Sequence, residues 1–204
     1  MERPLQNRVS PFGEILARPE RGAMFGNRGG RIHDPLTQRL SRRRWASKAW
    51  ICCVLSFKGR ARQVMGPGYT ELFFLDEATA LAAGHRPCFE CRRADAKAFA
   101  AAWARAQGLA APPRAPAMDD VLHAQRRGAR ARARAKDLPA GVLFFDEADA
   151  VFLKREADVL PWGWDGYGRP RAAPGGEVGV LTPPAMADAL AAGFRPRLHP
   201  SASG

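Results

Sequence analysis

The stretch Phe74-Leu-Asp-Glu-Ala-Thr-Ala-Leu-Ala-Ala-Gly-His-Arg-Pro-Cys-Phe-Glu-Cys-Arg92 predicts a capped helix, a glycine turn and a pair of cysteines in direct succession. Asp76 can cap a short helix over residues 77–83, because its carboxylate accepts hydrogen bonds from the free amides of the first turn. Gly84 suits the position just after a helix, where the backbone takes a left-handed φ. Cys88 and Cys91 then have the C-x₂-C spacing with which two thiolates bind one metal ion from a tight turn.

A C-x₂-C pair supplies only half of a tetrahedral site, so the remaining ligands must come from Cys52, Cys53 and the histidines. Cys52 and Cys53 belong to a predicted strand over residues 50–57, in which neighbouring side chains point to opposite faces. Only one of the two is therefore expected to reach the metal. Three apolar residues share the face of Cys53 and indicate that it points inward, namely Ile51, Leu55 and Phe57.

The segment from Phe74 to Arg92 resembles the second half of the zinc-binding domain of the bacterial Ada methyl-DNA repair protein. The same half-motif occurs in zinc-stabilised tails of some nuclease-like and competence proteins, where a His and a single Cys complete the site. Ada-type domains have a C-x₃-C first pair, one member of which accepts a methyl group, whereas this chain has adjacent cysteines. The resemblance to the tails implies one Zn²⁺ ion with three thiolate ligands and one imidazole ligand: Cys53, Cys88, Cys91 and His33, with His85 as the alternative imidazole.

The arrangement of apolar runs, helix caps and turn residues predicts an α+β fold. We expect an Ada-like zinc-binding module with an irregular N-terminal arm at residues 1–108, a Pro-rich linker and basic helix at 109–136, and a β-meander and helix module at 137–204. As a whole, the chain also resembles an uncharacterised bacterial protein family that has this knuckle and a C-terminal Leu-Thr-Pro-Pro segment, here residues 181–184.

Apolar runs and breakers place the individual elements. The arm, residues 1–34, is expected to lack regular structure, and the strand over 50–57 is expected to belong to a hairpin, followed by a strand at 69–75 and a helix at 92–107. The basic helix is expected to begin at Asp119 or Asp120 and to run to about residue 136. The C-terminal module is predicted to hold a meander, a fourth strand and a helix capped by Thr182: strands at 141–145, 150–153, 159–162 and 177–181.

An internal repeat links the two modules. Residues 78–87 and 187–196 agree at eight of ten positions and end in Gly-His-Arg-Pro and Gly-Phe-Arg-Pro. Both copies predict a short helix that stops at a glycine and leaves in an extended Arg-Pro segment. The second copy has Arg197 and Pro200 where the first has Cys88 and Cys91, so it cannot bind metal in the same way.

The net charge of +12 is concentrated in two segments that contain no Asp or Glu. Residues 35–70 hold eight Lys and Arg, and residues 121–136 hold six, so the rest of the chain has 18 basic and 20 acidic side chains. Clustered arginines bind phosphate through bidentate hydrogen bonds and counterion release. We therefore expect a nucleic-acid partner, with DNA favoured, bound through five arginines: Arg42, Arg43, Arg44, Arg127 and Arg130.

The leading functional hypothesis is a zinc-containing protein associated with nucleic acid, in DNA repair or processing, with a structural metal ion. A second hypothesis is an enzyme acting on DNA or a phosphorylated substrate, through a reactive thiolate such as Cys52 or through Asp120 and His123, which lie one helical turn apart. A third is a protein-interaction module whose arginines reflect genomic composition. The sequence does not decide whether the protein is an enzyme, nor its oligomeric state.

Several classes are excluded by composition and pattern. No apolar run approaches the roughly 18 residues that a membrane span requires, and the first residues lack a signal-peptide pattern. Four cysteines without an export signal favour reduced thiols in the cytoplasm, and hence metal binding over disulfides.

Overall fold

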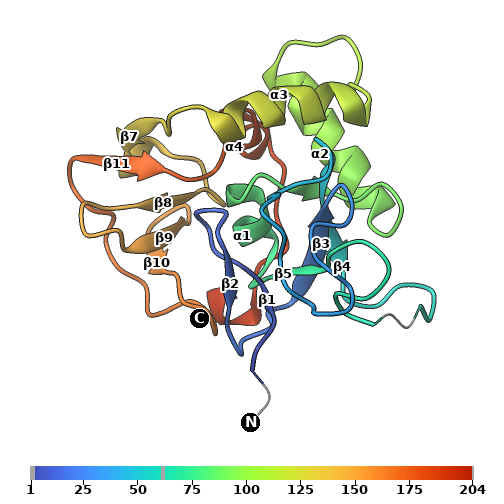
Figure 1. Cartoon of the computed structure of the whole chain (residues 1–204). Helices are drawn as coiled ribbons and strands as arrows, with labels where there is room; N and C mark the ends of the chain where they lie inside the picture. The colour runs from blue at the N-terminus through green and yellow to red at the C-terminus, as the bar shows by residue number, and fades with distance from the viewer. Residues whose placement is uncertain (1–2, 61–62, 204) are drawn as a thin grey trace.

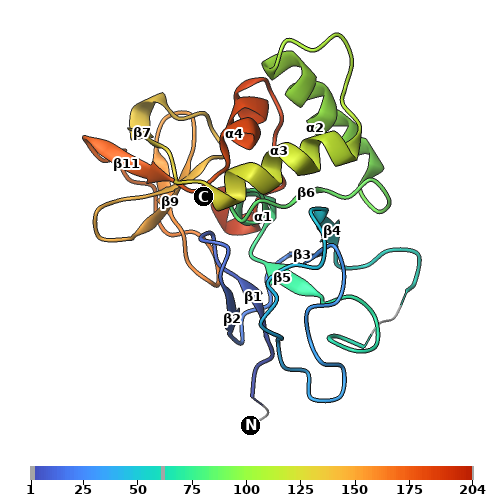
Figure 2. The same cartoon turned by 45° about the horizontal axis from the view of Figure 1, so that its top comes forward.

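The computed structural model describes residues 3–60 and 63–203, and Arg62 of the first basic segment lies outside these ranges. Within them the chain folds as α+β, as the sequence predicts, with two β-sheets on either side of a central helix (Figure 1). Three further α-helices lie together at one end of the molecule (Figure 2).

The first sheet has six strands in the order β2-β1-β5-β3-β4-β6. The bounds are β1 (Gln6–Val9), β2 (Ile15–Ala17), β3 (Met24–Arg28), β4 (Trp50–Val54), β5 (Leu72–Phe74) and β6 (Arg86–Pro87). The expectation of an irregular N-terminal arm is therefore wrong, because β1 to β3 come from it. The predicted hairpin is also wrong, since β4 pairs with the earlier β3 in antiparallel fashion and with β6 in parallel fashion.

The second sheet has five strands in the order β10-β9-β8-β11-β7. Its bounds are β7 (Arg132–Arg134), β8 (Leu143–Phe145), β9 (Val151–Lys154), β10 (Val159–Pro161) and β11 (Glu177–Val180). Strands β8, β9 and β10 form the predicted antiparallel meander. Strand β7 was not expected, because its Arg-Ala-Arg sequence continues the basic stretch that predicts helix.

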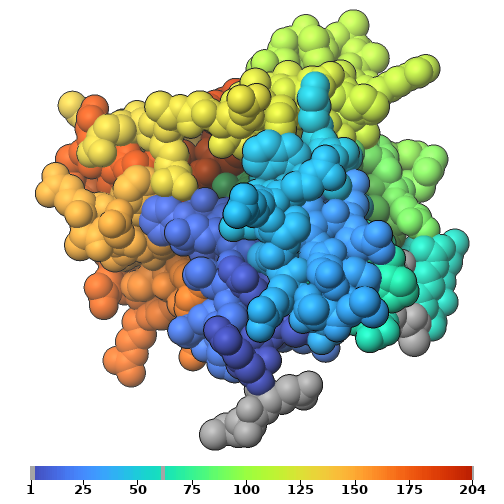
Figure 3. Space-filling model, viewed as in Figure 1, coloured from blue at the N-terminus to red at the C-terminus, as the bar shows by residue number. Residues whose placement is uncertain are grey.

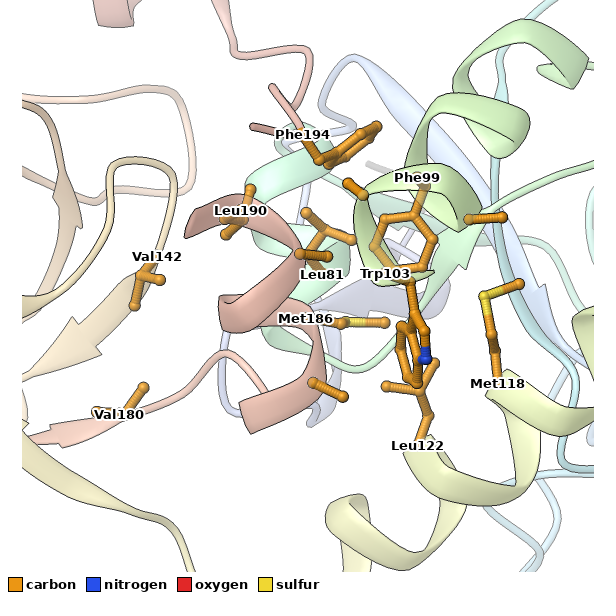
Figure 4. Close-up of a cluster of buried hydrophobic side chains, with 14 residues drawn as sticks. Leu81, Phe99, Trp103, Met118, Leu122, Val142, Val180, Met186, Leu190 and Phe194 are labelled. Atoms are coloured by element: carbon orange, nitrogen blue, oxygen red, sulfur yellow. The ribbon is translucent and has the colours of Figure 1, made fainter. Parts of the chain in front are cut away.

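The helices are α1 (Glu77–Ala82), α2 (Arg93–Ala106), α3 (Ala115–Arg127) and α4 (Pro184–Ala191), with short 3₁₀ turns at Ala135–Asp137 and Pro200–Ser203. Every residue of α1 is buried, and it packs against both β5 and β8. One apolar core joins α2, α3, α4 and the end of α1, with Phe99, Trp103, Met186 and Leu190 at its centre (Figure 4). The N-terminal and C-terminal modules are thus packed on shared cores.

Two helix boundaries differ from expectation. Helix α3 begins at Ala115, four residues before Asp119, because Pro116 fits the first turn, where its missing N–H needs no partner. It ends at Arg127, well before residue 136. Helix α4 is not capped by Thr182, whose hydroxyl instead accepts a hydrogen bond from the Leu143 amide at 3.0 Å.

Both copies of the repeat end their helices in the same way. Gly84 and Gly193 have φ of +82° and +100°. In the first copy the amides of Gly84 and His85 donate to the carbonyls of Leu81 and Ala80. In the second copy Gly193 and Phe194 make the matching pair of bonds to Leu190 and Ala189. Both ends are therefore Schellman motifs, as the two glycines predict.

Candidate metal centre and basic face

Cys53, Cys88 and Cys91 form the one group of His, Cys, Asp or Glu ligand atoms that fits a metal ion among the described residues. Their three sulfur atoms all lie within 4.8 Å of one another. Zn–S bonds of about 2.3 Å would place the sulfurs of a tetrahedral site about 3.8 Å apart, so only small shifts would be needed to bind an ion. Three cysteines that the sequence predicts as ligands are therefore brought together and can hold a metal ion.

Backbone pairing sets the position of the knuckle. Strand β6 runs parallel to β4, and the Cys88 amide donates to the Cys52 carbonyl at 2.9 Å, which places the knuckle beside Cys53. The Glu90 amide donates to the Cys88 sulfur at 3.4 Å, and the Val54 amide donates to the sulfur of Cys91. Such N–H groups stabilise thiolate charge, which is the form a metal ion binds.

The three thiols titrate as a coupled group. Hydrogen bonding to Cys88 and Cys91, together with burial, raises the pKa of Cys53 far above its usual value. The hydrogen bonds that Cys88 accepts from Cys53 and Cys91 lower the pKa of Cys88. Without a bound cation, ionisation of the Cys88 thiol is thus favoured, and ionisation of Cys53 is disfavoured. A divalent ion would remove this conflict by neutralising several thiolates together.

Cys52 lies on the opposite face of β4 and takes no part in the cluster. Its side chain is completely buried in the core between the first sheet and α1, with Leu72 and Phe74. Cys53 is buried, as predicted, at 5% exposure, but the prediction that Leu55 and Phe57 share a core-facing side with it is wrong, because Leu55 is 45% exposed and the apolar core lies on the Cys52 side. Burial and the Glu77 carboxylate raise the pKa of Cys52, so this thiol stays protonated and inaccessible.

Neither candidate histidine joins the cysteines. His33 is buried, with its Nδ1 2.5 Å from the Thr70 hydroxyl oxygen and its Nε2 2.9 Å from the Gly66 carbonyl oxygen, so both ring nitrogens are engaged. His85 is fully buried against Phe74 and Trp50, and its Nε2 accepts a hydrogen bond from Arg28 at 3.3 Å. Within the described ranges no fourth His, Cys, Asp or Glu atom belongs to the group.

The Asp and His pair considered for catalysis is not assembled. Asp119 is buried and receives two hydrogen bonds from Arg86, at 2.9 and 2.8 Å. Asp120 pairs with Lys48 at 2.7 Å. The imidazole of His123 lies edge-on to Trp45, 5.7 Å between ring centres, and neither carboxylate orients it.

The two acid-free segments of the sequence meet in space. Arg126 of α3 donates to the Lys48 carbonyl at 3.1 Å, Lys48 reaches back to Asp120, and Trp45 packs on His123. In Figure 3 the light-blue atoms of the chain before β4 lie directly below the yellow atoms of α3. The structure thus brings residues 45–48 of the first segment beside α3 of the second, whereas Arg60 and Arg132 pair with Glu90 and Glu177 elsewhere.

The five arginines expected to bind phosphate are all exposed. Arg42 and Arg43 make no ion pair in the described part of the chain, and Arg44 donates to the Ser41 carbonyl at 2.7 Å. Arg127, at the end of α3, is also without an ion pair there. Arg130 lies over the Phe12 ring at 5.0 Å and donates to the Phe12 carbonyl.

Sequence reasoning missed a group of buried cations around Trp50. Arg28 and Arg126 both lie over the Trp50 ring, 4.0 and 4.3 Å from its centre. Burial, with the charges of Arg126 and Arg44, lowers the pKa of Arg28 to about 9. The only signal in the sequence was that Trp50 and Arg126 lie within the acid-free segments, which does not reveal that Arg28 and Arg126 stack on Trp50.

The fold and the cluster define an α+β protein with three clustered cysteines that can hold a metal ion. No protein-family model, curated protein or solved structure matches this chain. In the part of the chain that the structure describes, no helix is both long enough and apolar enough to span a membrane.

Proposed function

We propose that this chain is a zinc-containing protein that associates with nucleic acid, with DNA favoured over RNA. The observation that carries the proposal is the contact between the two acid-free segments at Lys48 and α3, together with three exposed arginines, Arg42, Arg43 and Arg127, that have no carboxylate partner among the described residues. Such side chains gain most from phosphate, because binding releases the counterions of the polyanion without breaking existing ion pairs.

Zn²⁺ is the ion that we propose for the cluster. Cys53, Cys88 and Cys91 offer three soft sulfur ligands, which favour Zn²⁺ over oxygen-preferring cations such as Mg²⁺ or Ca²⁺. When bound, the ion would supply a cross-link between β4 and the knuckle that leads into α2. We assign it a structural role, with a solvent molecule or another donor completing the tetrahedron. The four cysteines are free thiols, as a reducing compartment such as the cytoplasm would keep them.

DNA repair or processing is the context that we propose. Its support is the resemblance of residues 74–92 to the zinc knuckle of Ada-type repair domains. The enzymatic alternatives have less support from the geometry, because Cys52 is buried and Asp120 pairs with Lys48 and not with His123.

The test of the nucleic-acid proposal is duplex binding as a function of salt. The observed affinity of the native protein for a random-sequence DNA duplex should fall steeply between about 50 and 200 mM salt. The double variant Arg42→Gln/Arg43→Gln should bind more weakly and show a shallower slope of log affinity against log salt. The matched control, Arg169→Gln/Arg171→Gln, makes the same change of charge at exposed positions outside the two basic segments. Affinity that is indifferent to salt, or equal losses in both variants, would contradict the proposal.

A further inference from the structure

A pocket of about 440 Å³ lies where the two sheets and three helices come together. Its walls come from the turn after β1, the end of α1, the end of α3 with the following chain, and the segment from β11 into α4; they include Phe12, Trp50, Arg126, Arg130, Thr182 and Pro183. In Figure 3 it is the hollow below the yellow chain, with green atoms of α1 and red-brown atoms of the C-terminal part on its floor. No part of the cysteine cluster lines it.

The charge of this pocket has one sign. Arg126 and Arg130 line it, and no Asp or Glu is among its lining residues. Behind Trp50, Arg28 is only 2% exposed, and its guanidinium hydrogen bonds go to neutral acceptors: the Gly13 carbonyl at 2.7 Å, the His85 ring and the Arg44 carbonyl. The carboxylate that acts on Arg126 is that of Asp119, which is already held by Nε and Nη2 of Arg86. Among the described residues, neither the buried Arg28 nor the half-buried Arg126 therefore has a carboxylate hydrogen-bonded to it.

One atom of the pocket has no partner. The Nε and Nη1 atoms of Arg126 donate to the carbonyls of Gly84 and Lys48, whereas its Nη2 is buried and makes no hydrogen bond. Leaving a buried charged donor unpaired is costly, and such groups in folded proteins commonly bind an ion or a water molecule. Burial lowers the pKa of Arg126 to about 10, so the side chain remains charged at neutral pH.

We propose that this pocket binds a phosphate group, held by Arg126 and Arg130. A phosphate oxygen would be an acceptor for Nη2, which is buried in this structure and must turn toward the pocket to reach it, and the charge of the phosphate would offset the cations around Trp50. The remaining wall, from Ala82, Ala83, Val180, Leu181 and Pro183, is apolar and would contact the organic part of the ligand. The ligand class is therefore a phosphorylated compound, either a free nucleotide or the phosphate of a nucleic-acid strand.

Titration calorimetry on the full chain tests the proposal with four probes: inorganic phosphate, a free nucleoside monophosphate, and one short single-stranded oligonucleotide with and without a 5′-phosphate. Wild-type protein should bind phosphate, and Arg126→Gln and Arg130→Gln should each weaken binding at least tenfold. Arg130 is exposed, so its variant should fold even if Arg126→Gln is destabilised through the loss of its bonds to Gly84 and Lys48. The matched control is Arg169→Gln, which removes an exposed charge outside both the pocket and the two basic segments.

The probes also distinguish the source of the phosphate. Tighter binding of the 5′-phosphorylated strand indicates a terminal phosphate, equal binding of both strands indicates an internal diester, and binding of the mononucleotide alone indicates a free nucleotide. No binding of any probe, or an equal loss in Arg169→Gln, would overturn the proposal. The two proposals can fail separately, because Arg42 and Arg43 do not line the pocket. Failure of the pocket proposal leaves salt-dependent duplex binding intact. Loss of duplex binding in Arg42→Gln/Arg43→Gln leaves phosphate binding in the pocket intact.

Discussion

The two copies of the repeated decapeptide have the same helix end but different surroundings. After the first Schellman motif, Arg86 and Pro87 pair with β4 and carry Cys88 and Cys91 to Cys53. After the second, the chain crosses the start of α1, where the Arg197 amide donates to the Glu77 carboxylate at 2.8 Å and the His199 amide donates to Asp76. The segment after the first copy builds the three-cysteine cluster that can hold a metal ion, and the segment after the second copy covers the helix of the first copy.

This difference shows which level of sequence information determines each feature. The helix, glycine and Arg-Pro exit need only local signals, so both copies adopt them. The packing of the segment after each copy depends on the neighbouring elements. The segment after the first copy pairs with the edge of β4, and the segment after the second copy binds the buried carboxylates at the start of α1. The identity of one residue also differs, since His85 in the first copy faces Arg28 while Phe194 in the second packs on Phe99.

The largest expected effect is the loss of stability when the proposed metal ion is removed from the cysteine cluster, which follows the first copy and has no counterpart after the second. A chelator that strips the ion should lower the free energy of unfolding by more than about 5 kcal/mol, because metal binding in such sites is coupled to folding. Urea unfolding with and without chelator measures the change. Without chelator, Cys88→Ser should already unfold at the urea concentration at which the chelator-treated native protein unfolds. Adding chelator should not change the unfolding of this variant. A native protein whose unfolding ignores the chelator would contradict this role of the first copy.

The next effect concerns the buried ion pair between Arg92 and Glu77, which also contacts the chain that follows the second copy. Arg92 and Glu77 are completely buried and bonded at 2.6 and 2.7 Å, and the same carboxylate accepts from Arg197 of the second exit. Arg92→Met leaves Glu77 as a buried charge without its cation and should cost about 3–5 kcal/mol in urea unfolding. Arg93→Met, at the exposed neighbouring position, should cost less than about 0.5 kcal/mol. Similar costs for both variants would show that the buried pair does not hold the exits together.

A smaller effect compares the two glycines directly. Alanine at either position must adopt a positive φ, at a cost of about 1–2 kcal/mol. At Gly84 its Cβ would also lie 2.8 Å from Nε of Arg126, whereas at Gly193 the nearest atom is 3.7 Å away. The melting temperature of Gly84→Ala should therefore be lower than that of Gly193→Ala. The reverse order would mean that Arg126 does not pack on the first turn as described.

The smallest effect is a pH dependence that only the first copy has. Burial and the charges of Arg28 and Arg126 lower the pKa of His85 well below its usual value, so the folded protein keeps this ring neutral. Below the unfolded pKa of about 6.5 the unfolded chain binds a proton that the folded chain does not, and stability falls as the pH decreases. His85→Phe, which copies the second repeat, should lose less stability between pH 7 and pH 5 than wild type. His199→Asn, outside the core, should follow wild type.

The sequence predicted the parts of the fold that depend on nearby residues. The Asp76 cap, at 2.9 Å from the Thr79 amide, the two glycine turns, the meander and the C-x₂-C knuckle all follow from residues within about ten positions of one another. The α+β class and the knuckle ligands Cys88 and Cys91 could be predicted for the same reason, whereas Cys53 was inferred from the need for further ligands.

The parts that the sequence did not predict depend on distant partners. Strand β3 forms only because β4 and β5 pair with it, and β4 begins more than twenty residues later. His33 has the residue type and loop position of a ligand, yet Thr70 and Gly66 engage both of its nitrogens. The sequence placed the apolar core on the Cys53 face of the strand, whereas it lies on the Cys52 face. The reason is that the apolar alternation continues into residues 55–57, which leave the sheet and are exposed or partly exposed.

Metal analysis of purified cysteine variants tests the central claim most directly. The native chain and Cys52→Ala should each contain close to one zinc per chain, because Cys52 lies in the core on the far side of β4. Cys53→Ala, Cys88→Ala and Cys91→Ala should each lose most of it, since each removes one of the three clustered sulfurs. A native protein without metal, or a loss of zinc in Cys52→Ala equal to that in Cys53→Ala, would contradict the account.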